Sequence, residues 1–231
     1  MRGLLLGSAL VLLGALPAIA ATVYSNDFSS GLNGFSAGTT ESSAPGNEVF
    51  LSNFGSAGTQ LNLSGLAANS AVTVTFTLDV IGSEDGNGPE GGGADFFKVS
   101  LNGASAFNEN FANYQGANTQ SYGGPGLGGG TYAPGTGAAG TGTLGYSGFP
   151  GGTRDSIYSL TVTGLTNSSG VLAVLFQDLS NQNRSDEYYG IDNVTVQGTL
   201  APAPIPAALP LFASALGGLG FVGWRRRKPR A

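Results

Sequence analysis

The chain has 231 residues, 40 of them glycine, a formal net charge of −5, and neither Cys nor His. These absences exclude a histidine base, a cysteine nucleophile, a His/Cys zinc or haem site and a disulfide framework. Residues 21–200 hold all fourteen carboxylates but only three basic residues, Lys98, Arg154 and Arg184, which gives this part a charge of −11. Such an acidic body repels phosphate, so we expect no nucleic-acid partner.

The first twenty residues are typical of a secretory signal peptide. Arg2 precedes an apolar run over residues 4–16, which is followed by the small residues Ala18 and Ala20. A run of about 13 apolar residues is too short to cross a bilayer core of roughly 30 Å. We predict that signal peptidase removes residues 1–20 and that the remaining chain is exported.

Residues 21–200 predict one all-β domain. Residues 71–81 alternate, with apolar side chains on one face and threonines and Asp79 on the other, as in a half-buried antiparallel strand. Shorter runs of similar character, separated by Gly, Asn, Ser and Pro, occupy residues 22–28, 49–51, 60–63, 96–101, 156–162, 171–179 and 188–197. About eight short strands without helical periodicity indicate an antiparallel β-sandwich, specifically a jelly roll.

A glycine-rich segment, residues 116–152, interrupts this pattern and carries no charge. We expect a long mobile loop, and not a phosphate-binding loop, because no strand precedes its glycines, no helix follows and no Lys is near. The tyrosines in or beside it could stack on sugar rings, or could simply pack the segment onto the sandwich. They are Tyr114, Tyr122, Tyr132 and Tyr146.

Acidic residues gather in three places and are candidate ligands for calcium. Carboxylates on turns supply the hard oxygen atoms that calcium prefers. The candidates are Asp27 near the first strand, Asp85 and Asp95 in the middle of the chain, and Glu187 and Asp192 near the last strand. First and last strands of a jelly roll often lie side by side, so Asp27 and Asp192 are expected to approach each other. The alternative is that these acids only cap turns and keep the surface soluble.

A glycoside hydrolase would need two carboxylates about 5 to 9 Å apart in a cleft. Glu84, Glu109 and Glu187 are available, but nothing in their spacing selects a pair. We therefore expect no enzymatic activity.

The segment 186–196, DEYYGIDNVTV, resembles the closing strand of secreted bacterial jelly-roll domains related to carbohydrate-binding and laminin-G-like modules. Residues 85–89, DGNGP, and 95–103, DFFKVSLNG, resemble the middle section of the same domains. The resemblance implies a sandwich with a structural calcium ion. Its implied ligands here are Asp85, Asp95, Glu187 and Asp192.

The C-terminal residues form three consecutive parts. Residues 201–206 are a proline-rich hinge, residues 207–224 carry no charge, and residues 225–231 are basic. An apolar stretch of about 20 residues that ends in Trp and Arg predicts a transmembrane helix over 207–224 with a cytoplasmic tail. The exported body would then lie on the other side of the membrane.

This tripartite end resembles the PEP-CTERM sorting signal of Gram-negative bacteria, with Ile205 in place of the Glu that gives the motif its name. The matching residues are Pro204, Ile205, Pro206, Trp224, Arg225, Arg226 and Arg227. The resemblance implies that an exosortase processes the chain from an inner-membrane precursor. It also implies a structural or adhesive protein of the cell surface or of an exopolysaccharide biofilm. The alternatives are a calcium-dependent carbohydrate-binding module and, less favoured, a glycoside-active enzyme.

Overall fold

A computed structural model describes residues 20–43, 48–88, 93–113, 118–146, 155–203 and 208–226. The chain divides into two units, one ending at Leu200 and one beginning at Ala201. Several predicted features lie outside the described residues: residues 1–19 of the signal peptide, Tyr114, and the sorting-motif residues Pro204, Ile205, Pro206 and Arg227.

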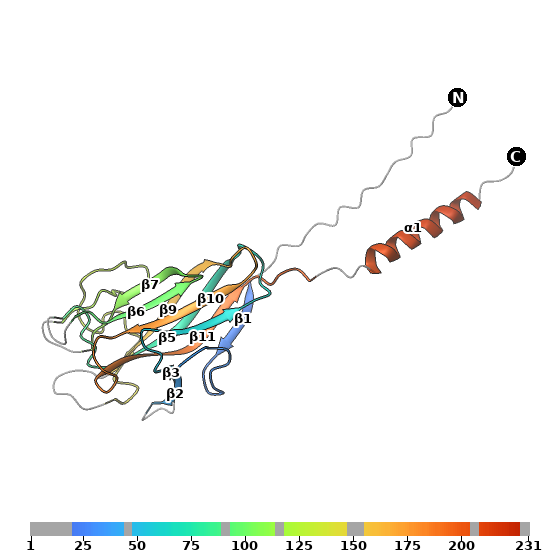
Figure 1. Ribbon diagram of the computed structural model, residues 1–231. Coiled ribbons are helices and arrows are strands. Elements are labelled where there is room, and N and C mark those ends of the chain that lie inside the picture. The colour runs from blue at the N-terminus through green and yellow to red at the C-terminus, as the bar shows by residue number, and fades with distance from the viewer. Residues whose placement is uncertain are drawn as a thin grey trace. The chain divides into compact units, whose positions relative to one another are not determined.

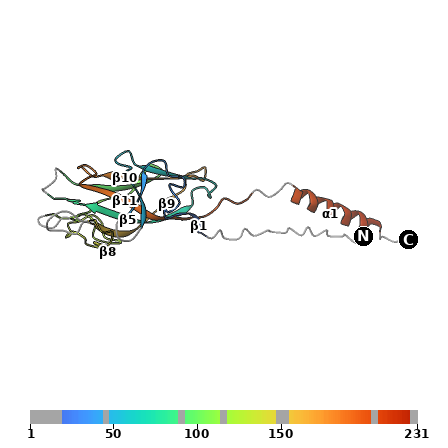
Figure 2. The same cartoon turned by 90° about the horizontal axis from the view of Figure 1, so that it is seen from below.

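The first unit is a sandwich of two antiparallel sheets, which confirms the predicted all-β fold (Figures 1 and 2). One sheet has the order β2-β3-β11-β5-β9-β8, and β1 also pairs with β11. Its strands are β1 (Ala21–Asn26), β2 (Thr39–Ser42), β3 (Val49–Ser52), β5 (Ala71–Gly82), β8 (Gly140–Thr141), β9 (Asp155–Leu165) and β11 (Glu187–Gly198). The other sheet has the order β4-β10-β6-β7, formed by β4 (Thr59–Leu63), β6 (Phe96–Leu101), β7 (Ala104–Asn110) and β10 (Leu172–Leu179).

Strand β5 lies between β9 and β11 and shows the alternation that the sequence predicts. Val74, Phe76 and Leu78 are buried in the core, and the intervening threonines are only half-buried on the outer face. The first and last strands pair as expected, with Asn26 opposite Val194. Successive side chains of a strand point to opposite faces. The position of an acidic residue along β5 or β11 therefore decides whether its side chain faces the core.

Aromatic side chains fill the space between the sheets. Phe97 contacts the rings of Phe76, Phe176 and Tyr189 at centroid distances of 5.4 to 6.3 Å. Phe111 contacts Tyr158 at 4.6 Å. Such pairs contribute about 0.5–1.5 kcal/mol each beyond their area burial, and they hold the sheets together in a chain that has no cysteine.

Three strands are absent from the sequence prediction: β2, β7 and β8. All three are at the edges of their sheets, and most residues of β7 are exposed or half-buried. An edge strand of this kind needs no alternating apolar residues, so its sequence, ASAFNEN, carries no strand signal.

The described part of the glycine-rich segment packs on the sandwich. Tyr122 is 5% exposed and joins the main core, and Leu144 is buried with Phe50 and Ile81 in a second apolar cluster. Gln120 is fully buried, and its side-chain amide donates to the carbonyl oxygens of Tyr122 and Thr136. The predicted mobility of the segment therefore does not extend to these side chains.

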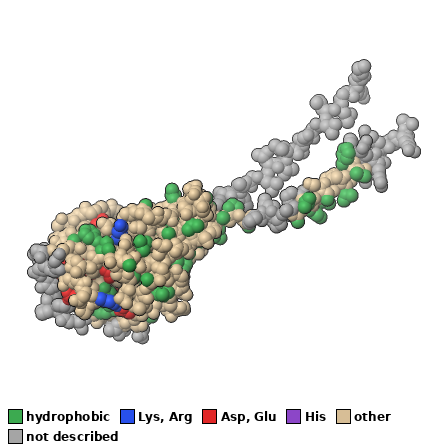
Figure 3. Space-filling view, in the orientation of Figure 1, with side chains coloured by type: hydrophobic (Ala, Val, Ile, Leu, Met, Phe, Trp, Pro, Cys, Tyr) green, Lys and Arg blue, Asp and Glu red, His purple; other side chains and the backbone are tan. Residues whose placement is uncertain are grey.

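Charged side chains are sparse on the face of the sandwich that Figure 3 draws, where most of the surface is uncharged. This agrees with a chain in which only 10% of residues are charged. Many of the acidic residues are instead buried, among them Asp79, Glu84, Asp95 and Glu187.

The second unit contains helix α1, Ala208–Arg226. The helix confirms that this part of the chain is helical, but the transmembrane span predicted over 207–224 is not found: no helix among the described residues is long and apolar enough to cross a membrane. Four glycines, Ser214 and two terminal arginines lower the mean hydropathy of α1.

Candidate metal centre

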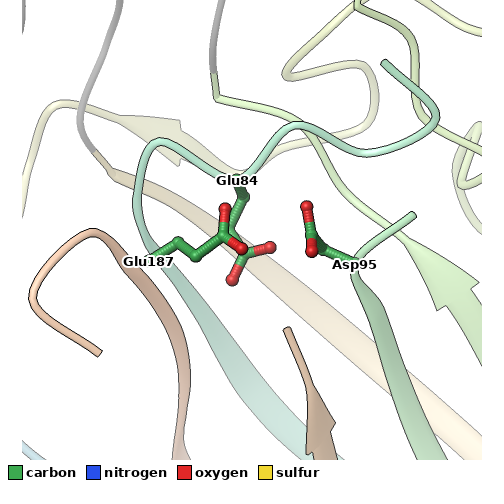
Figure 4. Close-up of side chains that lie close together, drawn as sticks. All are labelled: Glu84, Asp95 and Glu187. Carbon is green, nitrogen blue, oxygen red and sulfur yellow. The ribbon is translucent and has the colours of Figure 1, made fainter. Parts of the chain in front are cut away.

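Three buried carboxylates meet at one end of the sandwich. Glu84, Asp95 and Glu187 each offer a carboxylate oxygen within 4.8 Å of the others, and their side chains point toward one another (Figure 4). None of the three is more than 1% exposed. We call this group the acidic triad.

Glu84 is brought to the triad by a sharp change of direction at the end of β5. Gly82, opposite Glu187 in the sheet, has φ +84°, and a Cβ there would lie 1.9 Å from the carbonyl oxygen of Asp186. Only glycine fits this conformation and this space. The amide of Asn113 then donates to the Glu84 carbonyl oxygen at 2.8 Å, which fixes the backbone at the triad.

Asp95 precedes β6 and is held from both sheets. Its Oδ1 accepts from the amide of Asn181 at 2.9 Å, and its Oδ2 accepts from the amide of Asp85 at 3.2 Å. The Tyr189 hydroxyl donates to the Asp95 carbonyl oxygen at 2.8 Å. Because Tyr189 belongs to β11, the triad links the ends of strands from opposite sheets.

The triad has hydrogen-bonding capacity that the protein does not satisfy. Glu84 Oε1 accepts from the Ser180 hydroxyl at 2.8 Å, and Glu187 Oε1 accepts from the Gln182 amide at 3.1 Å. The Oε2 atoms of both glutamates are buried without a hydrogen bond from outside the triad, and within it the carboxyl groups of Glu187 and Asp95 share a hydrogen bond. A buried oxygen without a hydrogen bond costs about 1–3 kcal/mol, and more when it is charged.

Burial and mutual repulsion raise the pKa values of the triad. Burial raises the pKa of Glu84 well above its ordinary value, and the charges of Glu187 and Asp95 raise it further. Burial, followed by the charge of Asp95, raises the pKa of Glu187 to about 9. Burial also raises the pKa of Asp95, although the hydrogen bonds from Asn181 and Asp85 oppose the shift. Without a cation, the triad must therefore retain protons at neutral pH.

The donor set fits a hard divalent cation such as calcium. Calcium takes 6–8 oxygen ligands at 2.3–2.6 Å and accepts irregular geometry. Asp178, whose charge acts on both Glu84 and Asp95, adds a fourth carboxylate nearby. A hollow of about 190 Å³ is bordered by Asp178 and Glu187, which gives an ion a route from solvent. A cation here would supply the partners that both orphaned Oε2 atoms lack.

The predicted ligands divide between the triad and other places. Asp95 and Glu187 belong to the triad. Asp85 lies next to the triad, but its two carboxylate oxygens already accept hydrogen bonds. The donors are the side-chain amides of Asn118 and Gln182, each at 3.1 Å. Its contribution to the site is the backbone amide that binds Asp95.

Asp192 and Asp27 do not join the triad, although the family resemblance implied Asp192 as a ligand together with Asp85, Asp95 and Glu187. Asp192 comes five positions after Glu187 on β11, so the two side chains point to opposite faces of the sheet. Asp27 is exposed and accepts from the hydroxyl of Ser29 at 2.6 Å. The charge of Asp27 helps to raise the pKa of Asp192, which indicates that the two residues lie near each other, as predicted.

Of the two roles left open for the tyrosines, packing is observed at Tyr122, a core residue in contact with Phe111 and Tyr158 that also lines a hollow beside the glycine-rich segment. Tyr146 stands edge-on to Tyr188 and is half-buried, and Tyr132 is also half-buried. Tyr132 lies under the backbone of Gly123 and Gly130, where a Cβ would be within 2.3 to 2.6 Å of its ring. These contacts support packing of the glycine-rich segment onto the sandwich.

Sequence reasoning missed Glu84 as a ligand, together with the supporting residues Asp178 and Ser180. Glu84 directly precedes the DGNGP segment, but its role depends on the turn at Gly82, which no spacing rule reveals. Asp178 ends β10 and accepts from the Tyr189 amide at 3.1 Å. Its position follows from strand pairing between distant parts of the chain.

Comparison with known proteins gives structural neighbours only. No protein-family model matches the chain, and no curated protein matches it. The CBM22-1 xylan-binding domain of Paenibacillus barcinonensis Xyn10C superposes with 11% identity and TM-score 0.41, covering 81% of this chain and all of that domain. The CBM22-1–GH10 modules of Clostridium thermocellum Xyn10B, complexed with xylohexaose, give 12% identity and TM-score 0.28, covering 83% of this chain and 30% of that one.

A GH115 glucuronidase, BtGH115A, gives 13% identity and TM-score 0.36, covering 82% of this chain and 19% of the enzyme. The neighbours thus include carbohydrate-binding jelly-roll domains. All three TM-scores are below 0.5, so these neighbours do not establish a function for this chain.

The raised pKa of Glu187 predicts how stability depends on pH in the cation-free protein. Folding moves this pKa from its ordinary 4.5 to about 9, so the folded state holds a proton that the unfolded chain releases. The stabilisation is complete below about pH 4.5 and is lost as the pH rises toward 9. In urea unfolding with a chelator, we expect the free energy of unfolding to fall across this range.

Glu187→Gln provides the control, because an amide does not titrate. Its free energy of unfolding should fall less steeply, by up to about 1.4 kcal/mol per pH unit for one proton. Parallel pH profiles for the two proteins would show that Glu187 titrates normally in the fold.

Proposed function

We propose that this domain is a calcium-stabilised, non-catalytic carbohydrate-binding module of an exported protein. The observation that carries the proposal is the acidic triad, with its two orphaned buried oxygen atoms at the loop end of the sandwich. Calcium bound there would fix the turns after β5, before β6 and before β11. The rest of the sandwich would then present a rigid surface to a glycan.

The surface that suits a glycan runs along strands β7 and β9. A hollow of about 340 Å³ lies between these strands and the glycine-rich segment. Its lining combines hydroxyl groups of Ser159 and Thr161 with the apolar side chains of Phe107 and Leu127. Hydroxyl donors and acceptors beside apolar surface are the groups that recognise a sugar.

A second hollow, of about 380 Å³, lies farther along the same two strands. It is lined by Asn102, Ser105 and Thr163, with Leu101 and Leu165 as apolar neighbours. Strand β7 is the edge of its sheet, and β8 pairs with β9 only at Ser156 and Ile157. This side of the sandwich is therefore open to a chain-like ligand.

Charge favours a neutral or amino-bearing glycan over a uronic acid polymer. Of the described residues that line the two hollows, Glu109 alone is charged. Residues 21–200 carry three basic side chains against fourteen acidic ones. A polyanion would be repelled by such a surface.

A catalytic role for the triad is disfavoured by burial. Two carboxylates about 5 Å apart would suit a retaining glycosidase, but Glu84 is fully buried and Asp95 is too. The small hollow beside the triad is bordered by Glu187 and not by either of them. A sugar ring could not reach the pair of acids that such a reaction requires.

Calcium should raise the thermal stability of the full chain. At 100 times its dissociation constant, a ligand stabilises the native state by about 2.7 kcal/mol. For a domain of this size, that corresponds to a rise in Tm of roughly 5–10 °C. Differential scanning fluorimetry with millimolar calcium and with chelator measures the shift.

Glu84→Gln should lower the calcium-dependent shift, because it removes one charge from the triad. Glu109→Gln, which removes one carboxylate from the surface groove, should keep it. An equal shift in both variants, or no shift in the native chain, would remove the triad as a calcium site.

Glycan binding should follow the charge of the groove. In affinity gel electrophoresis, we expect retardation by a neutral hemicellulose or by chitosan and none by polygalacturonate. Leu127→Ala should weaken binding about tenfold, because burial of a leucine contributes roughly 1.5–3 kcal/mol.

Leu200→Ala is the matched control: Leu200 is 59% exposed and Leu127 is 55% exposed. This variant should bind as the native chain does. Preferential binding of polygalacturonate, or equal losses in both leucine variants, would count against the groove.

We further propose that an exosortase processes the C-terminal segment and that the sandwich reaches the cell surface or matrix. The proline-arginine pattern of residues 204–227 supports this proposal. The sandwich unit ends at Leu200, before the segment begins. In α1, Leu211, Phe212 and Leu219 are 64 to 70% exposed.

Mass spectrometry of the exported protein tests the processing. We expect peptides up to the region of Pro206 and none that contain Phe221 or the arginines that follow it. Replacing Arg225, Arg226 and Arg227 with alanine should leave the segment attached. A native chain recovered from the medium with its arginines intact would contradict the proposal.

A further inference from the structure

One acid, Glu109, lines the groove along β7 and β9. It belongs to β7, the edge strand of the smaller sheet, and borders the hollow of about 340 Å³ beside the glycine-rich segment. In the register of β6 and β7 it stands opposite Phe97, which is fully buried in the core. Residues that stand opposite each other share a face of the sheet. The Glu109 side chain therefore lies on the inner face of β7, at the open side of the sandwich.

The protein does not neutralise this carboxylate. Glu109 is half-buried, and it forms neither an ion pair nor a hydrogen bond with any other described residue. Its Oε2 and Oε1 atoms face Gly129, where a Cβ would lie 3.4 and 3.6 Å from them. Because glycine has no such atom, the space beside both oxygens is left open. A carboxylate in this state favours a ligand that brings a positive charge.

The basic residues of the described sandwich are directed elsewhere. Lys98 stands opposite Asn108, one residue along from the Phe97–Glu109 pair, so it lies on the other face of the smaller sheet. Arg184 forms an ion pair with Glu41. A single carboxylate offers two oxygens, too few for calcium, which takes 6–8. A small organic cation needs only one such partner.

Aromatic rings beside Glu109 also favour a cation. Phe107 precedes Glu109 by two residues and shares its face of β7. The Tyr122 ring lies 5.9 Å from the Phe107 ring, and both residues line the hollow together with Glu109. The face of an aromatic ring carries partial negative charge and attracts an ammonium group. Carboxylate and rings thus select the same sign of charge.

We propose that Glu109 binds the ammonium group of an amino sugar, so that the groove prefers a glycan with unacetylated hexosamine units. This inference rests on the proposed glycan-binding function and names the class of its ligand. An ammonium group donates up to three hydrogen bonds. It can therefore meet the carboxylate together with the hydroxyl groups of Ser159 and Thr161, which line the same hollow from β9. An N-acetylated sugar presents a neutral amide there and lacks the charge.

Two oligosaccharides of equal length and linkage test this preference, one of β-1,4-linked glucosamine and one of N-acetylglucosamine. Calorimetric titration of the full chain is done at a pH that keeps the amines protonated. The native chain should bind the glucosamine oligomer about tenfold more tightly, as expected where a hydrogen bond to a charged group replaces a neutral one. Glu109→Gln should bind the two oligomers with similar affinity.

Asp27→Asn is the matched control. It also removes one negative charge, but from an exposed residue that does not line the groove. This variant should keep the native preference. Equal losses of preference in both variants would reveal general attraction of a cationic chain to the acidic body, and would overturn the role of Glu109.

The remaining outcomes separate this inference from the glycan-binding function. Equal binding of both oligomers by the native chain would overturn the role of Glu109 and leave glycan binding by the groove intact. Binding of neither oligomer would overturn it as well, and the groove itself would fall only if a neutral hemicellulose also failed to bind. Binding of oligolysine in place of the glucosamine oligomer would assign the carboxylate to a basic peptide and contradict the inference.

Discussion

Repulsion between buried carboxylates is the constraint on which the rest of this structure depends. Glu84, Asp95 and Glu187 are brought within 4.8 Å of one another in a site almost free of water. Among the described residues, Arg184 forms an ion pair with Glu41 and not with a member of the triad. The triad therefore has no basic partner in this part of the chain. Charge balance at this end of the sandwich must therefore come from protons or from an ion that the protein binds.

This requirement explains how function and fold are connected. The triad links the end of β5, the start of β6 and the start of β11, so that one ion could join turns from both sheets. A chain without cysteine has no disulfide to do this, and the aromatic core reaches these turns through Tyr189, whose hydroxyl donates to the Asp95 carbonyl oxygen. With its acids directed inward, the sandwich keeps a largely uncharged groove along β7 and β9, which suits a glycan rather than a polyanion.

The sequence predicts those parts of the fold that have a local pattern. The alternation of apolar and polar residues in β5 predicts which of its side chains face the core. The pairing of β1 with β11 follows from the strand order of a jelly roll. Asp95 is predictable as an acid beside a glycine-rich turn, and Glu187 as part of the segment that resembles a jelly-roll closing strand. Glu84 is not, because it depends on the conformation of Gly82. Nor is Tyr122 predictable as a core residue, because its partners Phe111 and Tyr158 are supplied by tertiary packing that no local spacing encodes.

The most direct test of the acidic triad as a cation site is anomalous X-ray diffraction from crystals of the full chain grown with calcium. We predict an anomalous peak with oxygen atoms of Glu84, Asp95 and Glu187 at about 2.3–2.6 Å, the distance typical of calcium. The peak should be absent from crystals of Glu84→Gln grown under the same conditions. A calcium-saturated crystal of the native chain with no peak at the triad, and with the three carboxyl groups hydrogen-bonded to one another, would contradict the account.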